Sequence, residues 1–593
     1  MIDPITLSVV RSSLEQICNE MDQHLIRSSM SPIISETNDC AHGIYDPRNG
    51  ETIAQGVVGL PVFLANMQFA VQAVLAEATA QGGFAPGEVW ILNDVYRGGT
   101  HLNDVNLVAP VFVDGELFAL IASTGHWMDI GGGAPGGWNP DATEIHQEGI
   151  VIPPVRLWQG GERNDALIDT IMANVRLPRE MLGDLVAMSS AVQMGERRLR
   201  DLVDRHGRAT LTECLGELIE RSERQMRSHI ADIPDGTYRY ADTLDNDGVV
   251  DEPLRIEVAI TVSGDTMVID FDGSSPAARG PLNLAAISTV SVCYVALKHI
   301  FPDVPINGGT FRPAEVRIPD GTVIAAQYPS PTSGYLEVGN RVLDVMFGAL
   351  AQAIPERVPA APFGTIGVVT VGGVHPDTGR FFVGVFPYPG GYGATPDGDG
   401  LVNGTPPISM ANFVALEASE HRYPLMFEYF ALRENTGGAG RYRGGDGTTY
   451  RIRPWAPLVV SVMGDRADSA PFGLDGGGPA EPNEVVVHVD GVDITPPMRT
   501  KLAKQPLGPG DWLTVASPGG GGHGDPLTRP LEDVDRDLNL GYITAESAET
   551  DFGVVIAERW TVGGHARFSL DPQRSAQRRA ERAAPAASAV GAD

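Results

Sequence analysis

The stretch HLNDVNLVAPVFVDGELFALIASTGH, residues 101–126, decides how the first part of this chain folds. Asp114-Gly115 is a strong signal for a two-residue hairpin turn, because both residue types tolerate the positive φ that such turns require. The segments on either side are rich in Val, Leu, Phe and Ile, as strands are. The sequence therefore predicts an antiparallel hairpin with polar residues at its open end.

The register of this hairpin brings two histidines and a carboxylate together. Counting outward from the turn places His126 opposite Asn103. His101 then lies diagonally across from His126, at a Cβ separation of roughly 7–8 Å, within reach of one shared metal ion. Strict alternation sends Asp104 to the other face, so the cluster requires the backbone to bend near Asn103.

Two histidines with one carboxylate and open positions suit a catalytic Zn, Mn or Fe(II) ion, which lowers the pKa of bound water or polarises a carbonyl. The spacing alone favours the structural alternative, a hydrogen-bonded loop histidine and a capping aspartate. Asp39, in the polar segment ETNDC, is a further candidate ligand, with an ordinary turn residue as the alternative.

Further polar groups follow the hairpin. Asp129 precedes the glycine-rich segment GGGAPGG, residues 131–137, which lets backbone approach a substrate but does not match a dinucleotide-binding motif. Glu144, His146 and Glu148 alternate, so an extended strand would present them to one cleft as acid/base groups or as partners of the ligands; a solvated strand face is the alternative.

These observations give two sets of candidates. The candidate metal ligands are Asp39, His101, Asp104 and His126. The candidate catalytic residues are Asp104, His126, Asp129, Glu144 and His146.

Composition limits the partners. The 593 residues carry 43 Lys+Arg against 75 Asp+Glu, a net charge of −32, which disfavours nucleic acid and anionic membranes. Apolar runs such as residues 286–297 are shorter than the roughly 20 residues of a membrane helix, and no signal peptide opens the chain. We expect a cytoplasmic protein.

Cysteine and lysine usage add two expectations. The four cysteines are scattered without a CxxC pair, as buried free thiols are. The three lysines, Lys298, Lys501 and Lys504, do not follow a P-loop pattern, so any nucleotide is expected on another chain.

The periodicity of the chain predicts an α+β, multi-domain protein with mixed and antiparallel sheets. Helical patterns fill much of the first 230 residues, and strand patterns separated by glycine-rich turns dominate from about residue 237 to 530. The predicted units are an N-terminal region with the metal site, a β-rich region, a C-terminal extension and a disordered tail: residues 1–230, 231–530, 531–571 and 572–593.

Several long motifs, in order, carry a resemblance to a known family. They include SPIISETNDCAHGIYD (31–46), NDVYRGGTHLNDV (93–105), TGHWMDIGGGAPGG (124–137), QEGIVIPPVRL (147–157), PINGGTFRP (305–313), FALRENTGGAGRYRGGDG (430–447) and SPGGGGHGDP (517–526). Over about residues 2 to 560 the chain resembles the B subunit of the hydantoinase B/5-oxoprolinase family.

The resemblance implies an ATP-dependent enzyme. It implies a metal held by His101, Asp104 and His126, with Asp39 as a less certain ligand, and ATP-Mg bound by an A-type partner subunit that phosphorylates a carbonyl oxygen. The favoured function is ring opening of a small cyclic amide, such as a hydantoin, oxoproline or lactam, by water that the metal activates. The resemblance also implies a hetero-oligomer, such as a dimer of heterodimers.

Two other functions stay open from the sequence. One is a subunit of an ATP-dependent acetone- or acetophenone-type carboxylase, in which an enol phosphate attacks activated CO₂. The other is a non-catalytic subunit that supports an A-type enzyme.

Overall fold

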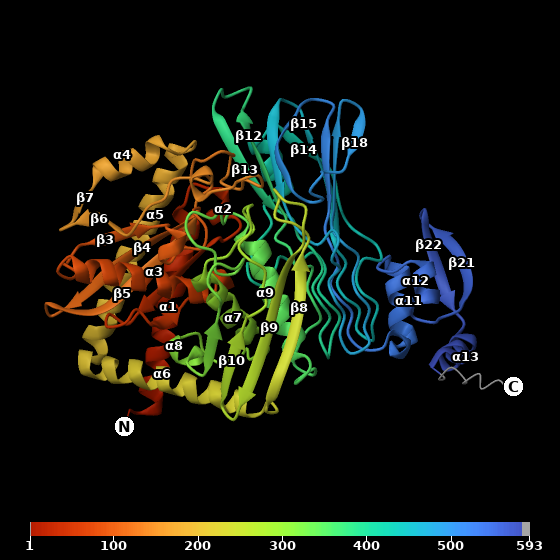
Figure 1. Ribbon diagram of the computed structural model, residues 1–593, viewed down its shortest axis with the longest axis horizontal. Coiled ribbons are helices and arrows are strands. Elements are labelled where there is room, and N and C mark those ends of the chain that lie inside the picture. Colours follow the sequence, from red (N-terminus) through yellow and green to blue (C-terminus); the bar gives the residue numbers. More distant parts are fainter. Residues whose placement is uncertain (1, 584–593) are drawn as a thin grey trace.

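The computed structural model describes residues 2–583, except the side chains of Leu64 and Ala65. Its α+β architecture confirms the predicted fold class. The N-terminal helices and sheet, a second four-stranded sheet, a β-sandwich and a small C-terminal lobe follow one another across the molecule (Figure 1).

The first sheet has seven strands in the order β2-β1-β5-β4-β3-β6-β7. All its pairings are antiparallel. The strands are β1 Cys40–Tyr45, β2 Thr52–Gln55, β3 Val89–Leu92, β4 Asp104–Val113, β5 Glu116–His126, β6 Val155–Gln159 and β7 Glu162–Arg163. The central strands are buried on both faces, because helices cover each side.

Two layers of helices cover this sheet. Helices α1 (Pro4–Ser28) and α5 (Pro178–His206) pack together on one face. Helix α3 (Pro61–Ala80) packs on the other face and against α7 (Ala286–Ile300). Short helices α2 (Pro32–Ser35) and α4 (Asp165–Ala173) lie beside them.

Helix α3 is long and apolar enough to cross a membrane, so the expectation that the apolar segments are too short for this is wrong at α3. Among the described residues it alone passes this test of length and composition. Since it packs against the sheet and α7, it has the contacts of a core helix.

A second sheet follows α6 (Arg208–Ala231) in the chain. Its strands lie in the order β11-β10-β9-β8, and α9 (Tyr335–Leu350), all of whose residues are buried, packs against it. The strands and the short helix that precedes β11 are β8 Gly236–Leu244, β9 Leu254–Ser263, β10 Thr266–Asp270, α8 Gly308–Phe311 and β11 Ala314–Arg317. One apolar core runs through the first sheet, its helices, and α7 and α9.

A β-sandwich with its own apolar core follows. One sheet, β13-β12-β16-β19, consists of β12 Val368–Val374, β13 Phe381–Pro387, β16 Leu458–Met463 and β19 Leu502–Leu507. The other, β14-β15-β20-β17-β18, consists of β14 Leu425–Leu432, β15 Thr448–Pro454, β17 Glu484–Val489, β18 Val492–Ile494 and β20 Trp512–Ala516, with α10 (Leu416–Arg422) beside β14.

Glycine-rich loops run side by side below the sandwich (Figure 1). They are linked through backbone hydrogen bonds such as Gly520 N–H to Gly445 O and Gly445 N–H to Tyr392 O. A Cβ on Gly391 would lie 1.8 Å from the Gly445 carbonyl oxygen, so only glycine permits this approach. Tight packing therefore explains these glycines.

The C-terminal lobe has a third small core. It contains α11 Leu531–Leu540, α12 Ala545–Thr550, β21 Ile556–Val562, β22 His565–Leu570 and α13 Pro572–Ala583. The predicted disorder from residue 572 is wrong for residues 572–583, because arginines of α13 bind carbonyl oxygens of the lobe: Arg579 donates to Phe552 O and Arg529 O. Residues 584–593 lie outside the described residues.

The buried side chains group differently from the predicted domain bounds. The first core continues across residue 231 and includes residues as far along the chain as Met463, the sandwich core lies between Val369 and Val515, and the buried residues of the third core lie beyond residue 530. The domain bounds themselves stay a prediction.

A buried ion cluster joins α9 to the sandwich. Arg341 on α9 binds Asp465, just after β16, at 2.8 Å, and Lys501 binds the other oxygen of Asp465 at 3.1 Å. Arg466 binds Asp344 of α9 at 2.5 Å. These side chains are fully shielded from solvent, so each charge depends on its partner.

We expect Asp465→Ala to lower the free energy of unfolding by about 3–5 kcal/mol, because it leaves Lys501 buried without its carboxylate and removes one of the three carboxylates that bind the buried Arg341. Urea titration followed by fluorescence measures this change. Glu315→Ala, which breaks an exposed pair with Arg317, is the control and should leave the midpoint unchanged. Equal shifts in both variants would contradict a special role for the buried cluster.

Candidate metal centre

The predicted hairpin forms, but with a different register at its open end. Val113 faces Glu116 as expected, and a β-bulge between Val111 and Phe112 then shifts the pairing by one residue. As a result Asp104, not Asn103, lies opposite His126. Directly paired residues share a face, so no bend near Asn103 is needed to bring the two side chains together.

Three ligand-type atoms converge at this end of the hairpin. His126 Nδ1 lies 3.1 Å from Asp104 Oδ1, and His101 Nε2 lies 3.2 Å from the same oxygen. The two imidazole nitrogens are 3.2 Å apart. All three side chains are buried.

The other carboxylate oxygen of Asp104, Oδ2, accepts hydrogen bonds from two hydroxyl groups. The Thr100 hydroxyl and the Tyr335 hydroxyl both donate to Oδ2, the latter at 3.2 Å. Burial acts to raise the pKa of Asp104, but the two histidines lower it more, so its pKa lies below its usual value. The carboxylate is thus ionised and fixed with Oδ1 toward both imidazoles.

The donor set fits a metal ion. Two ligand atoms bonded to one ion at about 2.0–2.2 Å lie roughly 3 Å apart when the angle between their bonds is about 90°. The three atoms here are separated by 3.1–3.2 Å, which matches this spacing. The ligand atoms of His101, Asp104 and His126 form the set that lies within 4.8 Å of one another. The three side chains therefore lie together, as the hairpin geometry predicts; that they bind a metal ion, and which ion, stay predictions.

Asp39 lies beside this cluster but outside the set. It lines the same cavity as His101 and His126, and its backbone carbonyl accepts from His126 N–H at 3.1 Å. Its Oδ1 is buried without a hydrogen-bond partner among the described residues. Burial raises the pKa of Asp39 to about 7, with His126 and Asp104 acting in opposite directions.

The cavity at the cluster is small. Its volume is about 20 Å³, enough for one water or an ion. Its lining comes from the first sheet and its loops, from α9, and from the sandwich: among others Trp138, Tyr335, Leu336, Val368, Val385 and Pro387. A pocket for a small organic ligand usually has about 300–1,000 Å³, so this conformation is closed to a cyclic substrate.

Asp129 does not join the cluster. Its carboxylate accepts from the backbone N–H groups of Gly131, Gly136 and Arg176 and from the Arg176 guanidinium at 3.0 Å. With four donors, both oxygens are occupied in holding the glycine-rich loop. The predicted catalytic role of Asp129 has no support from this geometry.

The predicted alternation of Glu144, His146 and Glu148 on a strand is wrong. The segment is a 3₁₀ turn, Ile145–Gln147, so the three side chains diverge. Glu144 and His146 are exposed, and His146 Nε2 contacts the Tyr328 hydroxyl at 2.9 Å. Turn geometry replaces the strand because Glu148 turns inward.

Glu148 is buried and anchors the start of α9. Its oxygens accept from the backbone N–H groups of Thr332 at 2.9 Å and Ser333 at 2.8 Å, two residues before Tyr335. Burial raises its pKa to about 7. Glu148 therefore helps to place the tyrosine that holds Asp104.

Three residues at the site were missed by the sequence analysis. Thr100 precedes His101 and could have been found as a nearby hydroxyl. Tyr335 and Trp138 gave no signal, because they approach from distant segments; the Trp138 ring meets the His101 ring edge-on at 5.3 Å.

The four cysteines are buried free thiols, as predicted.

Comparison with known proteins extends these observations. Residues 3–526 match the family model described as Hydantoinase B/oxoprolinase. The beta subunit of caprolactamase from Pseudomonas jessenii is 33% identical over 570 residues, covering 94% of this chain and 96% of that subunit.

Solved structures show the same fold. The ATP-dependent caprolactamase from Pseudomonas jessenii has a TM-score of 0.88 at 31% identity, covering 98% of this chain and 100% of that chain. The nucleotide-free acetone carboxylase has a TM-score of 0.89, covering 98% of this chain and 83% of that chain; at 21% identity it shows the shared fold alone.

Fold and site together define a multi-domain α+β protein that encloses a buried cluster of two histidines and one carboxylate. The sequence match spans most of the chain. The protein belongs to the hydantoinase B/oxoprolinase family, whose members here include an ATP-dependent cyclic amide hydrolase.

We expect His101→Ala and His126→Ala to abolish metal binding while leaving the fold intact, because each removes one ligand, His101 from the turn before β4 and His126 from the end of β5. Elemental analysis gives the metal content, and circular dichroism reports the fold. Unchanged metal content in both folded variants would contradict the site.

Tyr335→Phe should weaken metal affinity about 10- to 100-fold, because it removes a hydrogen bond that fixes Asp104. Metal titration with a competing chelator measures this loss. Tyr328→Phe, which removes a hydroxyl that contacts His146, is the matched control and should not change the affinity. The same affinity in all three proteins would show that Tyr335 does not hold the ligand.

Proposed function

We propose that this chain is the B subunit of an ATP-dependent cyclic amide hydrolase that opens a hydantoin, oxoproline or lactam ring. The observation that carries the proposal is the buried His101, Asp104 and His126 cluster in a chain 33% identical to a caprolactamase beta subunit. The acetone carboxylase likeness concerns the fold alone and does not favour carboxylation.

His101, Asp104 and His126 would hold a divalent transition metal ion. When bound, the ion would supply Lewis acidity that activates water and polarises a carbonyl. Thr100 and Tyr335 keep Asp104 oriented throughout, since their hydroxyls bind the oxygen that faces away from the histidines.

Asp39 would orient the attacking water and accept its proton. Its unpartnered Oδ1 lies in the lining of the cavity that His101 and His126 share, so it needs no rearrangement to meet a water there. The apolar walls, such as Leu336 and Val385, keep other water away and strengthen these polar interactions.

The substrate requires the cavity to open. A six- or seven-membered ring does not fit in about 20 Å³, so a lining segment must move before the ring meets Asp39 and the histidines. The lining combines α9 with the β-sandwich, so a small displacement between these two parts enlarges the site.

Activation of the amide is assigned to an A-type partner subunit with bound ATP-Mg. The chain contains no P-loop motif, and its relative is named as one subunit of caprolactamase. Phosphorylation of the amide oxygen on the partner makes the carbonyl carbon electrophilic enough for attack by water. The C–N bond of the resulting tetrahedral species then breaks as the nitrogen takes a proton, which leaves an acyl phosphate, and a second water hydrolyses this to the carboxylate and inorganic phosphate.

The complex of wild-type chain and partner should hydrolyse at least one of caprolactam, 5-oxoproline and hydantoin in proportion to ATP consumed. His126→Ala in the same complex should lose ring opening by at least about 10³-fold, because a ligand for the activating ion is removed. Chromatography of the opened product and phosphate release measure the two reactions.

Two outcomes would contradict the proposal. ATP-dependent carboxylation of a ketone without any amide hydrolysis would assign the carboxylase function instead. Full activity in the His126→Ala complex would make the chain a non-catalytic subunit. The purified chain alone is the control and should hydrolyse no ATP.

A further inference from the structure

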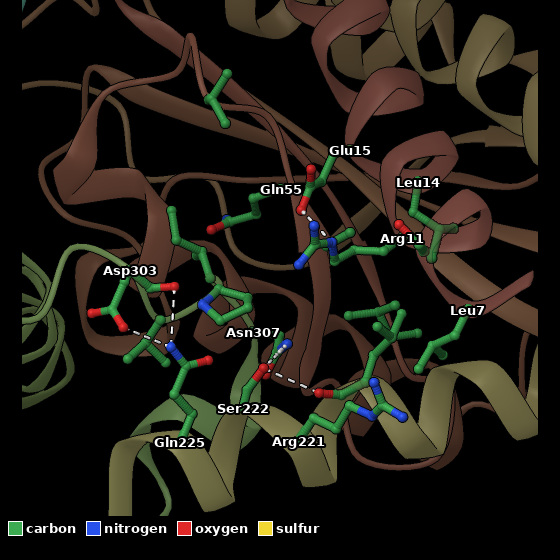
Figure 2. A pocket seen from close by; sticks show the side chains of 18 of the residues that line it. Leu7, Arg11, Leu14, Glu15, Gln55, Arg221, Ser222, Gln225, Asp303 and Asn307 are labelled. Atoms are coloured by element: carbon green, nitrogen blue, oxygen red, sulfur yellow. Dashed lines mark hydrogen bonds and ion pairs between the residues drawn. The ribbon is translucent and has the colours of Figure 1, made fainter. Parts of the chain in front are cut away.

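A large pocket lies away from the metal cavity, at the β2 edge of the first sheet. Its volume is about 720 Å³, within the range of small-molecule sites. It is bounded by the first half of α1, by β2, by α6 and by the loop after α7, residues 302–307 (Figure 2). It shares no lining residue with the cavity at the metal cluster.

The inner wall of this pocket has a buried acceptor without a donor. Gln55 is 3% exposed, and its Nε2 donates to the Tyr45 hydroxyl at 3.1 Å and to Phe63 O at 3.5 Å. These contacts fix the amide with Nε2 toward the protein. Its Oε1 is buried and has no hydrogen-bond partner among the described residues. An unpaired buried acceptor is costly, so this oxygen calls for an N–H group from a ligand.

Two positively charged side chains, Arg11 and Lys298, line the same pocket. Arg11 extends from α1 toward the space that Gln55 enters from β2 (Figure 2). Its ion pair with Glu15 is long, at 4.0 Å, and half-exposed. Lys298 uses two of its three N–H groups on the carbonyls of Pro302 and Val304. Both cations therefore retain donors for an anionic group.

Much of the remaining lining of the pocket is apolar. It is formed by side chains such as Leu7, Leu14, Ile53, Val304 and Pro305. A ligand that satisfies all three surfaces needs an N–H group at one end, a hydrocarbon segment, and a carboxylate at the other end.

We propose that this pocket binds a linear amino or carbamoyl acid, with its N–H group on Gln55 Oε1 and its carboxylate on Arg11 and Lys298. This is the chemical form of a ring-opened cyclic amide, so the pocket is a second site for the reaction product. The identification of the ligand as product rests on the proposed function; the pocket and its recognition groups do not.

The test measures binding of 6-aminohexanoate to the metal-loaded complex of the chain and its partner by equilibrium dialysis. Hexanoate and hexylamine, which each lack one polar end, serve as comparison probes. We expect saturable binding of 6-aminohexanoate that is at least tenfold tighter than binding of either comparison probe.

Variants locate the site. Arg11→Gln should weaken binding about 10- to 100-fold, because it removes a charged hydrogen-bond donor. Arg200→Gln is the matched control: Arg200 has the same 49% side-chain exposure and a similar i,i+4 pairing, but does not line the pocket. Gln55→Met should also weaken binding, with its thermal midpoint measured beside it to confirm folding.

His101→Ala separates this proposal from the proposed function. Binding should persist in that variant, because the pocket is distinct from the metal cavity; this result holds whether or not the complex hydrolyses amides. The proposal is overturned if binding is lost in His101→Ala but kept in Arg11→Gln. It is also overturned if hexylamine binds as tightly as 6-aminohexanoate, or if no saturable binding occurs in the complex.

Discussion

The candidate metal centre depends on one contact, the Asp104 carboxylate between two imidazoles. Asp104 Oδ1 lies 3.2 Å from His101 Nε2 and 3.1 Å from His126 Nδ1, in surroundings without solvent. A buried carboxylate is stable there because positive charge, from an ion or a protonated imidazole, offsets its desolvation. The hairpin, the tyrosine on α9 and the buried Glu148 all serve to keep this carboxylate in one orientation.

Much of the local structure could be predicted from the sequence. The Asp-Gly turn, the helical patterns of the first 230 residues and the buried cysteines follow from rules that act over a few residues. The resemblance of ordered motifs gave the family, and hairpin geometry brought His101 near His126. These predictions succeed because they depend on neighbours in the chain.

The errors have the opposite cause. The bulge at Val111 and Phe112 has no sequence signature, so the register was displaced by one residue. The strand expected around His146 is a turn because Glu148 finds backbone donors near residue 332, far along the chain. Tyr335 and Trp138 belong to the site for the same reason, through tertiary contacts that local patterns do not contain. Helix α13 forms because its arginines find carbonyl acceptors, which a count of apolar residues does not detect.

The bulge makes the metal centre depend on the register of the hairpin. In a strand, successive side chains alternate between faces, so the extra residue near the turn determines which side chain faces His126 about eight residues away. In a chain that pairs these two strands without the bulge, Asn103 would take the place of Asp104, although every ligand would still be encoded. The centre is therefore specified by the register of the hairpin as well as by the identities of its residues. An alignment that scores only matching letters would count such a chain as having kept the site.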